Sequence, residues 1–197
     1  MKNKILLILF QFLIFGNINF AHEGMWIPSL LKVLEGQMQS EGLQLSAEDI
    51  YSINSSSLKD AIVHFGGGCT AEVVSKEGLI LTNHHCGYSQ IQQHSSLEKN
   101  LLKKGFWAMS KKEELKNPGL TATFIVRIED VTERVLFEVK DVDSQEGMNK
   151  INTNIKSIEE EAVLNTKHKA KIKAFFYGNK YYMIVSKTYK DIRLVGA

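Results

Sequence analysis

Apolar and polar positions along this chain follow two different periods, and the change of period divides the sequence. From Ser29 to Gln39 apolar residues recur every three or four positions, which predicts a helix with Ser29 as N-cap and Gly42 beyond its end. Ser46 to Asp49 has the cap residue and acidic first turn of a second helix start. Once a leader is set aside, we therefore expect a helical lead-in over residues 22–60.

Short runs rich in β-branched and apolar residues follow, and they predict strands. Gly66–Gly68 separates the first two runs, and the tight turn Lys76–Gly78 joins the second and third into a β-hairpin. The strands are expected at Ala61–Phe65, Thr70–Val74, Leu79–Thr82 and Thr121–Ile128. Residues 61–132 are thus predicted to be rich in β-structure, with one helix at Ser96–Lys104.

The last third of the chain, residues 133–197, is predicted to hold a helix and then a β-hairpin. The polar stretch from Asp143 to His168 has weak apolar spacing and favours a surface helix or a helix pair. Ala174–Tyr177 and Tyr181–Thr188 flank Gly178-Asn179, as in a hairpin, and Ile192–Ala197 begins another extended run. The fold class is therefore mainly β with α additions.

The first 21 residues have the organisation of a secretory signal peptide. Lys2 and Lys4 form a positive start, an apolar run spans Ile5–Phe15, and cleavage is expected after Ala21. We expect export to the periplasm or cell surface of a bacterium, with no membrane association after cleavage. An uncleaved membrane anchor remains the alternative. The formal net charge of +2 is accounted for by the leader lysines, so the remaining chain offers no basic surface for nucleic acid.

The block from Gly66 to Cys86 carries the clearest chemical signal. A glycine-rich entry leads into a strand with Cys69, and after the tight turn a second strand delivers His85 just past its end, beside Cys86. A general-base imidazole needs such a fixed place at a strand end, facing a cleft. The two cysteines of an exported chain allow one intramolecular disulfide, Cys69–Cys86.

A metal site is the alternative interpretation of the same block. Histidine and cysteine side chains are soft metal ligands, and six of them gather here: His64, Cys69, His84, His85, Cys86 and His94. Neither a Cys-x-x-Cys nor a His-x-x-x-His spacing occurs among them, and exported cysteine pairs usually form disulfides. We therefore predict neither a bound metal nor a cofactor.

The segment from Thr82 to Cys86 resembles the histidine loop of chymotrypsin-like serine peptidases. Further blocks, in the same order and spacing, make the whole mature chain similar to serine peptidase family 46. One block is Trp26 with its neighbours on either side. The others are Gly67–Glu72, Thr82–Tyr88, Ile91–Ser95, Gly105–Ala108, Asn117–Leu120 and Arg127–Thr132. The family contains bacterial dipeptidyl-peptidases, which release dipeptides from oligopeptides with a free N-terminus.

The resemblance implies a chymotrypsin-like double β-barrel, of which residues 61–132 form the N-terminal barrel part. It implies that His85, rather than His84, is the general base, and that the complete enzyme is a homodimer. The family's catalytic aspartate, nucleophilic serine and pocket residues come later than position 197. We therefore expect an incomplete N-terminal portion that is inactive alone, with the start of an inserted helical region after residue 132.

Two points stay open at this stage. A non-catalytic exported binding or remnant module that keeps the barrel half is the alternative to a peptidase. Within the family, one branch prefers acidic residues at P1, the second residue of the released dipeptide, and another prefers apolar residues. Gly105–Trp107 and Phe124–Arg127 look slightly closer to the acidic-specific branch.

Overall fold

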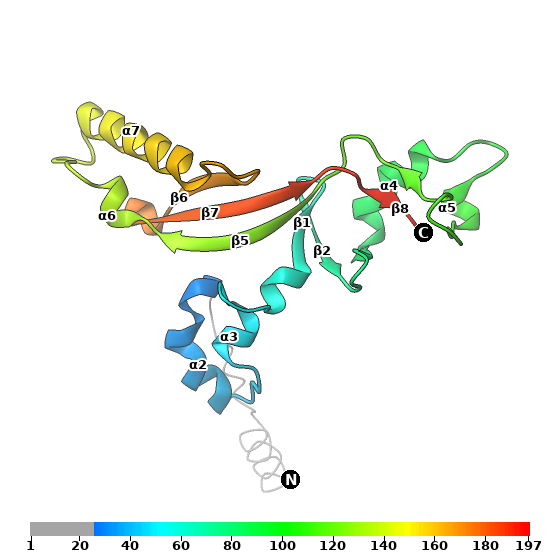
Figure 1. The fold of residues 1–197 in the computed structure, drawn as a ribbon, viewed down its shortest axis with the longest axis horizontal. Helices are drawn as coiled ribbons and strands as arrows, with labels where there is room; N and C mark the ends of the chain where they lie inside the picture. The colour runs from blue at the N-terminus through cyan, green and yellow to red at the C-terminus, as the bar shows by residue number, and fades with distance from the viewer. Residues whose placement is uncertain (1–25) are drawn as a thin grey trace, which may run out of the picture.

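A six-stranded antiparallel sheet is the main feature of the computed structural model, which describes residues 26–197 (Figure 1). The predicted leader and its cleavage point lie outside the described residues. The sheet has the strand order β3-β2-β1-β5-β7-β6, and a separate two-stranded ladder joins β4 to β8. The strands are β1 (Ile62–Phe65), β2 (Cys69–Val73), β3 (Ile80–Thr82), β4 (Leu115–Lys116), β5 (Ala122–Asp130), β6 (Lys169–Phe175), β7 (Lys180–Tyr189) and β8 (Arg193–Leu194).

Helices precede the sheet and are inserted between its strands. The lead-in contains η1 (Pro28–Leu30), α2 (Leu31–Ser40), α3 (Ala47–Ile50) and η2 (Leu58–Ala61), and the later helices are α4 (His84–Gln93), α5 (Leu101–Lys104), α6 (Thr132–Val135), α7 (Gln145–Ala162) and η3 (Phe176–Gly178). Among residues 26–197, no helix combines the length and the apolar character needed to cross a bilayer.

Strand β5 joins the two parts of the sheet. Its first residues pair with β1, as in Val63 opposite Phe124, and it pairs with β7 over its full length. The register shifts between Ile125 and Arg127, and such a bulge bends the strand. In Figure 1 the long strands β5, β6 and β7 lie beneath α7, whereas β1 and β2 branch away toward the lead-in helices.

Each part of the sheet has its own core. The first core lies between helices α6 and α7 and strands β6 and β7. The isoleucines of α7, Ile151, Ile155 and Ile158, follow helical spacing and form an apolar stripe that packs on these strands. The fully buried members of this first core include Val135, Met183 and Val185. The second core lies at β1 and β2 and consists of Val63, Phe65, Ala71, Leu120 and Ala122. This second core supports the histidine loop.

The structure confirms most of the predicted elements. The chain is sheet-rich with helical additions, both predicted hairpins form, and Asp143–His168 contains one helix, α7. Ser46 caps α3 in a capping box with Asp49, as its position in the sequence indicates. The C-terminal hairpin β6–β7 does not stand apart from residues 61–132, since β7 pairs with β5 in the same sheet.

Two local predictions are wrong, and one helix was not predicted. Ser29 is not an N-cap, because Pro28 begins a 3₁₀ turn there and Ile27 precedes it. The helix expected from Ser96 begins only after Asn100, whose side-chain oxygen accepts a hydrogen bond from the Lys103 N–H. Helix α4 was not predicted at all, because only one of its residues, Ile91, is buried and an apolar period is therefore missing.

Candidate active site

A short hairpin sets the position of the first turn of α4. The turn between β2 and β3 closes through a 2.8 Å hydrogen bond from the Val74 N–H to the Leu79 carbonyl. Gly78 has φ +83°, a left-handed conformation that glycine adopts without strain, so the predicted tight turn is confirmed. The Thr82 hydroxyl then donates to the Thr70 carbonyl at 2.9 Å, and the chain enters α4 directly afterwards.

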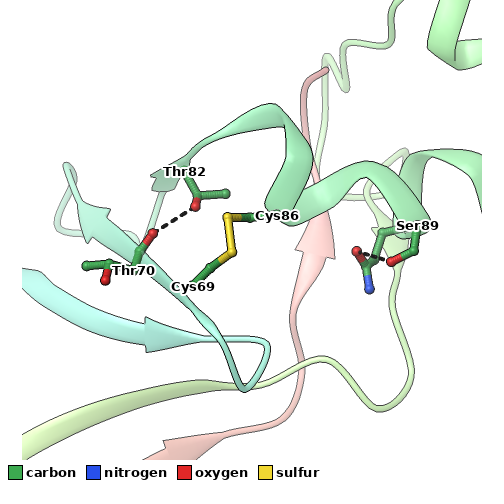
Figure 2. The surroundings of a disulfide bond; sticks show 6 residues. Cys69, Thr70, Thr82, Cys86 and Ser89 are labelled. Atoms are coloured by element: carbon green, nitrogen blue, oxygen red, sulfur yellow. Dashed lines mark hydrogen bonds between the residues drawn. A yellow bond between two sulfur atoms is a disulfide. The ribbon is translucent and has the colours of Figure 1, made fainter.

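The predicted Cys69–Cys86 disulfide is present and links β2 to α4 (Figure 2). The two Cα atoms are 6.1 Å apart, within the usual range for a bridged pair. Both cysteines are half-buried and pack against the second core. The first turn of α4 is therefore joined covalently to a strand of the sheet.

His85 lies directly beside this disulfide, as the second residue of α4. Its side chain is exposed, and one of its ring nitrogens lies within 4.8 Å of both sulfur atoms. The sulfur atoms bond to each other, so they offer no thiolates to a metal ion. No hydrogen bond or ion pair from residues 26–197 reaches the His85 imidazole. Its role as general base stays a prediction.

A wide groove of about 890 Å³ opens next to the hairpin, between β3, the start of α4 and the C-terminal strand β8. His84 lines this groove and makes an edge-on contact with Tyr88, with ring centroids 5.9 Å apart. Contrary to the expectation that His85 faces a cleft, the described walls of this groove include Asn83 and His84 but not His85.

Charged groups in the groove are already paired with one another. Lys111 lies 3.4 Å from Glu77, and Arg193 contacts both Asp191 at 2.7 Å and Glu114 at 3.3 Å. The Arg193 hydrogen bond lowers the pKa of the Asp191 carboxyl below its ordinary value. The cations of the groove therefore already have carboxylate partners within its own walls.

Two features of this region were missed by sequence reasoning. The His94 Nε2 atom lies 3.0 Å from the Oδ1 atom of Asn117, which is only 3% exposed. Trp107 packs over Gly196, where an added Cβ would come within 2.7 Å of the indole ring. His94, Trp107 and Asn117 all belong to the sequence blocks quoted above, so the blocks marked the right places without indicating contacts.

Comparison with known proteins gives consistent matches over nearly the whole chain. The sequence profile of the family described as Peptidase S46 matches residues 21–197. An Asp/Glu-specific dipeptidyl-peptidase of Flavobacterium psychrophilum is 51% identical over 176 residues, which cover 88% of this chain and 25% of that protein. A dipeptidyl-peptidase 7 of Phocaeicola vulgatus is 48% identical and covers 90% of this chain and 26% of its own length.

A solved structure agrees with these sequence matches. The crystal structure of Porphyromonas endodontalis DPP11 in complex with the dipeptide Arg-Glu has a TM-score of 0.78 and 43% identity, over 89% of this chain and 27% of that chain. The 197 residues therefore span about a quarter of the length of the curated relatives they match, and the match is to an N-terminal portion.

Proposed function

The chain belongs to the peptidase S46 family, and on that premise we propose that it forms the histidine-bearing N-terminal part of a serine-type dipeptidyl-peptidase. The complete enzyme would release dipeptides from oligopeptides with a free N-terminus. The observation that carries this proposal is the place of His85, at a strand end, in the first turn of α4 and beside the Cys69–Cys86 bridge.

His85 would act as the general base of acyl transfer. An imidazole takes the proton from the attacking serine hydroxyl and returns it to the leaving amine, which requires a fixed ring position. The disulfide restrains the residue next to His85, and the 2.9 Å contact between Thr82 and Thr70 restrains the strand that precedes it. The His85 side chain is exposed and unpaired within the described part, so a serine and an orienting carboxylate would be able to approach it.

The substrate preference we propose is for acidic residues at P1. The support is the order of the relatives: the Asp/Glu-specific relative of Flavobacterium psychrophilum is 51% identical, and the dipeptidyl-peptidase 7 of Phocaeicola vulgatus is 48% identical. The groove described above does not select for acid, because its cations Lys111 and Arg193 are paired with carboxylates. Selection for acidic P1 residues would therefore depend on residues beyond this chain.

Export to the periplasm or cell surface is also part of the proposal, as is assembly of the complete enzyme into a homodimer. The leader composition around Lys2 and Lys4 supports export, and a structural disulfide is compatible with an oxidising compartment. Residues 22–197 alone would be inactive, because the His85 imidazole has no partner within residues 26–197.

The experiment uses the full-length enzyme, meaning this chain together with the downstream sequence that its relatives carry. Dipeptide release is measured with dipeptidyl substrates that have Asp, Glu, Leu or Phe at P1 and differ in nothing else. We expect kcat/KM to be highest for Asp and Glu, and no turnover by residues 22–197 alone.

Equal rates for acidic and apolar P1 residues would contradict the preference but leave the peptidase assignment intact. An absence of dipeptide release from every substrate by a folded full-length protein would contradict the peptidase assignment and favour a non-catalytic module.

A further inference from the structure

Helix α4 carries His85, yet few contacts of its own hold it in place. Of its ten residues, only Ile91 is buried. At its start, Asn83 occupies the N-cap position without a side-chain hydrogen bond to the helix. The position of this helix therefore depends on attachments to the surrounding structure, one of which is the disulfide at Cys86.

A second attachment lies at the other end of the helix. His94 is the C-cap residue of α4, and its Nε2 atom lies 3.0 Å from Oδ1 of Asn117. An amide oxygen only accepts hydrogen bonds, so the histidine nitrogen carries the proton and donates it. Because Asn117 is 3% exposed, this hydrogen bond is shielded from competing water.

Asn117 is itself rigidly held. It begins a four-residue turn with Pro118 and Gly119 in the middle, closed by a 3.1 Å hydrogen bond from the Leu120 N–H to the Asn117 carbonyl. Gly119 has φ +88°, and proline followed by a left-handed glycine is the signature of a type II turn. Leu120 is buried in the second core, which fixes the turn to the sheet.

The Asn117 backbone makes one more connection, since its N–H donates to the Ile192 carbonyl at 3.0 Å. A continuous path of contacts thus leads from the core through Leu120 and Asn117 to His94, and along α4 to His85. This path joins two sequence blocks, Ile91–Ser95 and Asn117–Leu120, that the proposed function leaves without a role.

We infer that the His94–Asn117 pair is a positioning device for the catalytic imidazole of His85. It fixes the far end of α4, so that the helix cannot rotate about the disulfide at its near end. The inference rests on the proposed role of His85 as general base.

The size of the effect follows from the length of the helix. His94 lies eight residues beyond Cys86, or about 12 Å along the axis, and the His85 ring extends about 6 Å from that axis. A displacement of about 2 Å at His94 therefore moves the imidazole by about 1 Å. A misplacement of about 1 Å in a catalytic group lowers the rate by up to about 100-fold.

The test measures kcat, KM and thermal unfolding of the full-length enzyme and its variants. We expect Asn117→Ala and His94→Ala each to lower kcat by about 10-fold to 100-fold, with KM changed less than about twofold, since binding residues are untouched. The double variant should lose no more than either single variant, because the two residues act as one unit. His94→Gln keeps a donor for Asn117 and should recover most of kcat.

The matched control is Asn154→Ala. The Asn154 side-chain amide, on α7, donates to the carbonyls of Val135 and Phe137, each at 2.9 Å, and so joins α7 to the end of α6, away from His85. We expect this variant to lose stability in the same way while keeping kcat. An equal loss of kcat in Asn154→Ala would overturn the inference, because destabilisation alone would then explain the effect.

A kcat within twofold of the parent in both Asn117→Ala and His94→Ala would also overturn it. His85→Ala is measured in the same assay to separate the two proposals. If His85→Ala is inactive while Asn117→Ala is fully active, only the positioning role fails. If His85→Ala retains full activity, the proposed catalytic role fails and the positioning role fails with it.

Discussion

Removal of the Cys69–Cys86 bridge is a perturbation whose effect on stability can be calculated from the structure. The double variant Cys69→Ala/Cys86→Ala removes a cross-link between residues 17 positions apart, which encloses strand β3 and the tight turn before it. In the chain-entropy description, a cross-link that closes a loop of this size lowers the free energy of the folded state relative to the unfolded state by about 3 kcal/mol. For a chain of this length, that corresponds to a fall in Tm of roughly 6–12 °C.

The assay is denaturant unfolding of residues 22–197, followed by circular dichroism and tryptophan fluorescence, for the parent chain and the double alanine variant. Each protein is measured with and without a thiol reductant. The reductant should lower the parent's stability toward that of the variant and leave the variant unchanged. The fall in the parent's free energy of unfolding on reduction measures the cross-link itself, because both sulfur atoms stay in place. The remaining difference between the reduced parent and the variant measures the loss of the two half-buried sulfur atoms.

A difference below about 0.5 kcal/mol between the oxidised and reduced parent chain would refute this reasoning. Such a result would mean that the hairpin and α4 remain associated without the cross-link. The second core, in which Leu120 and Phe65 pack beside the bridge, would then be sufficient to hold the histidine loop.

Two further predictions concern positions outside the histidine loop. Gly147→Ala should lower the free energy of unfolding by about 1–3 kcal/mol despite alanine's better helix propensity, because the added Cβ would come within 1.8 Å of the Asp141 carbonyl oxygen. Gly36→Ala in α2, where the added Cβ meets open space, should instead raise the free energy of unfolding by about 0.5–1 kcal/mol. Urea unfolding measures both, and a gain in stability in both variants would contradict the argument. The Thr132 hydroxyl donates a hydrogen bond to Asp130 and lowers the pKa of its carboxyl, and Lys180, 3.0 Å from the other carboxylate oxygen, lowers it further. The ionised form therefore stabilises the fold above the unfolded pKa of about 3.9, and this contribution is lost as the pH falls through the folded pKa. Asp130→Asn should cost about 0.5–1 kcal/mol of unfolding free energy at pH 7 and almost nothing below the folded pKa, and a cost independent of pH would exclude this origin.

The sequence allowed the sheet to be predicted well wherever the period of apolar residues was strong. The β2–β3 hairpin was recognisable because Gly78 separates two apolar runs, and α7 because its isoleucines follow helical spacing. Pairing between distant strands was not predictable in the same way. That β7 lies beside β5 depends on long-range packing, which no local pattern encodes.

The site was predictable in its covalent and local parts only. The place of His85 after a strand and next to Cys86 follows from adjacent residues, and so does the bridge to Cys69. Helix α4 was missed because it buries only Ile91 and so lacks an apolar period. The His94–Asn117 contact joins residues 23 positions apart, and nothing in either segment specifies that they meet.

The central claim is that His85, and not its neighbour His84, activates a serine nucleophile. It is tested most directly by the rate at which a fluorophosphonate probe labels the full-length enzyme, since labelling requires a serine activated by its base. His85→Ala should lower the labelling rate and kcat/KM by several orders of magnitude, because the members of a catalytic triad act as a unit. His84→Ala, which removes a groove-lining ring in contact with Tyr88, should retain labelling within about tenfold of the parent. Equal losses in the two variants, or full labelling in His85→Ala, would contradict the account.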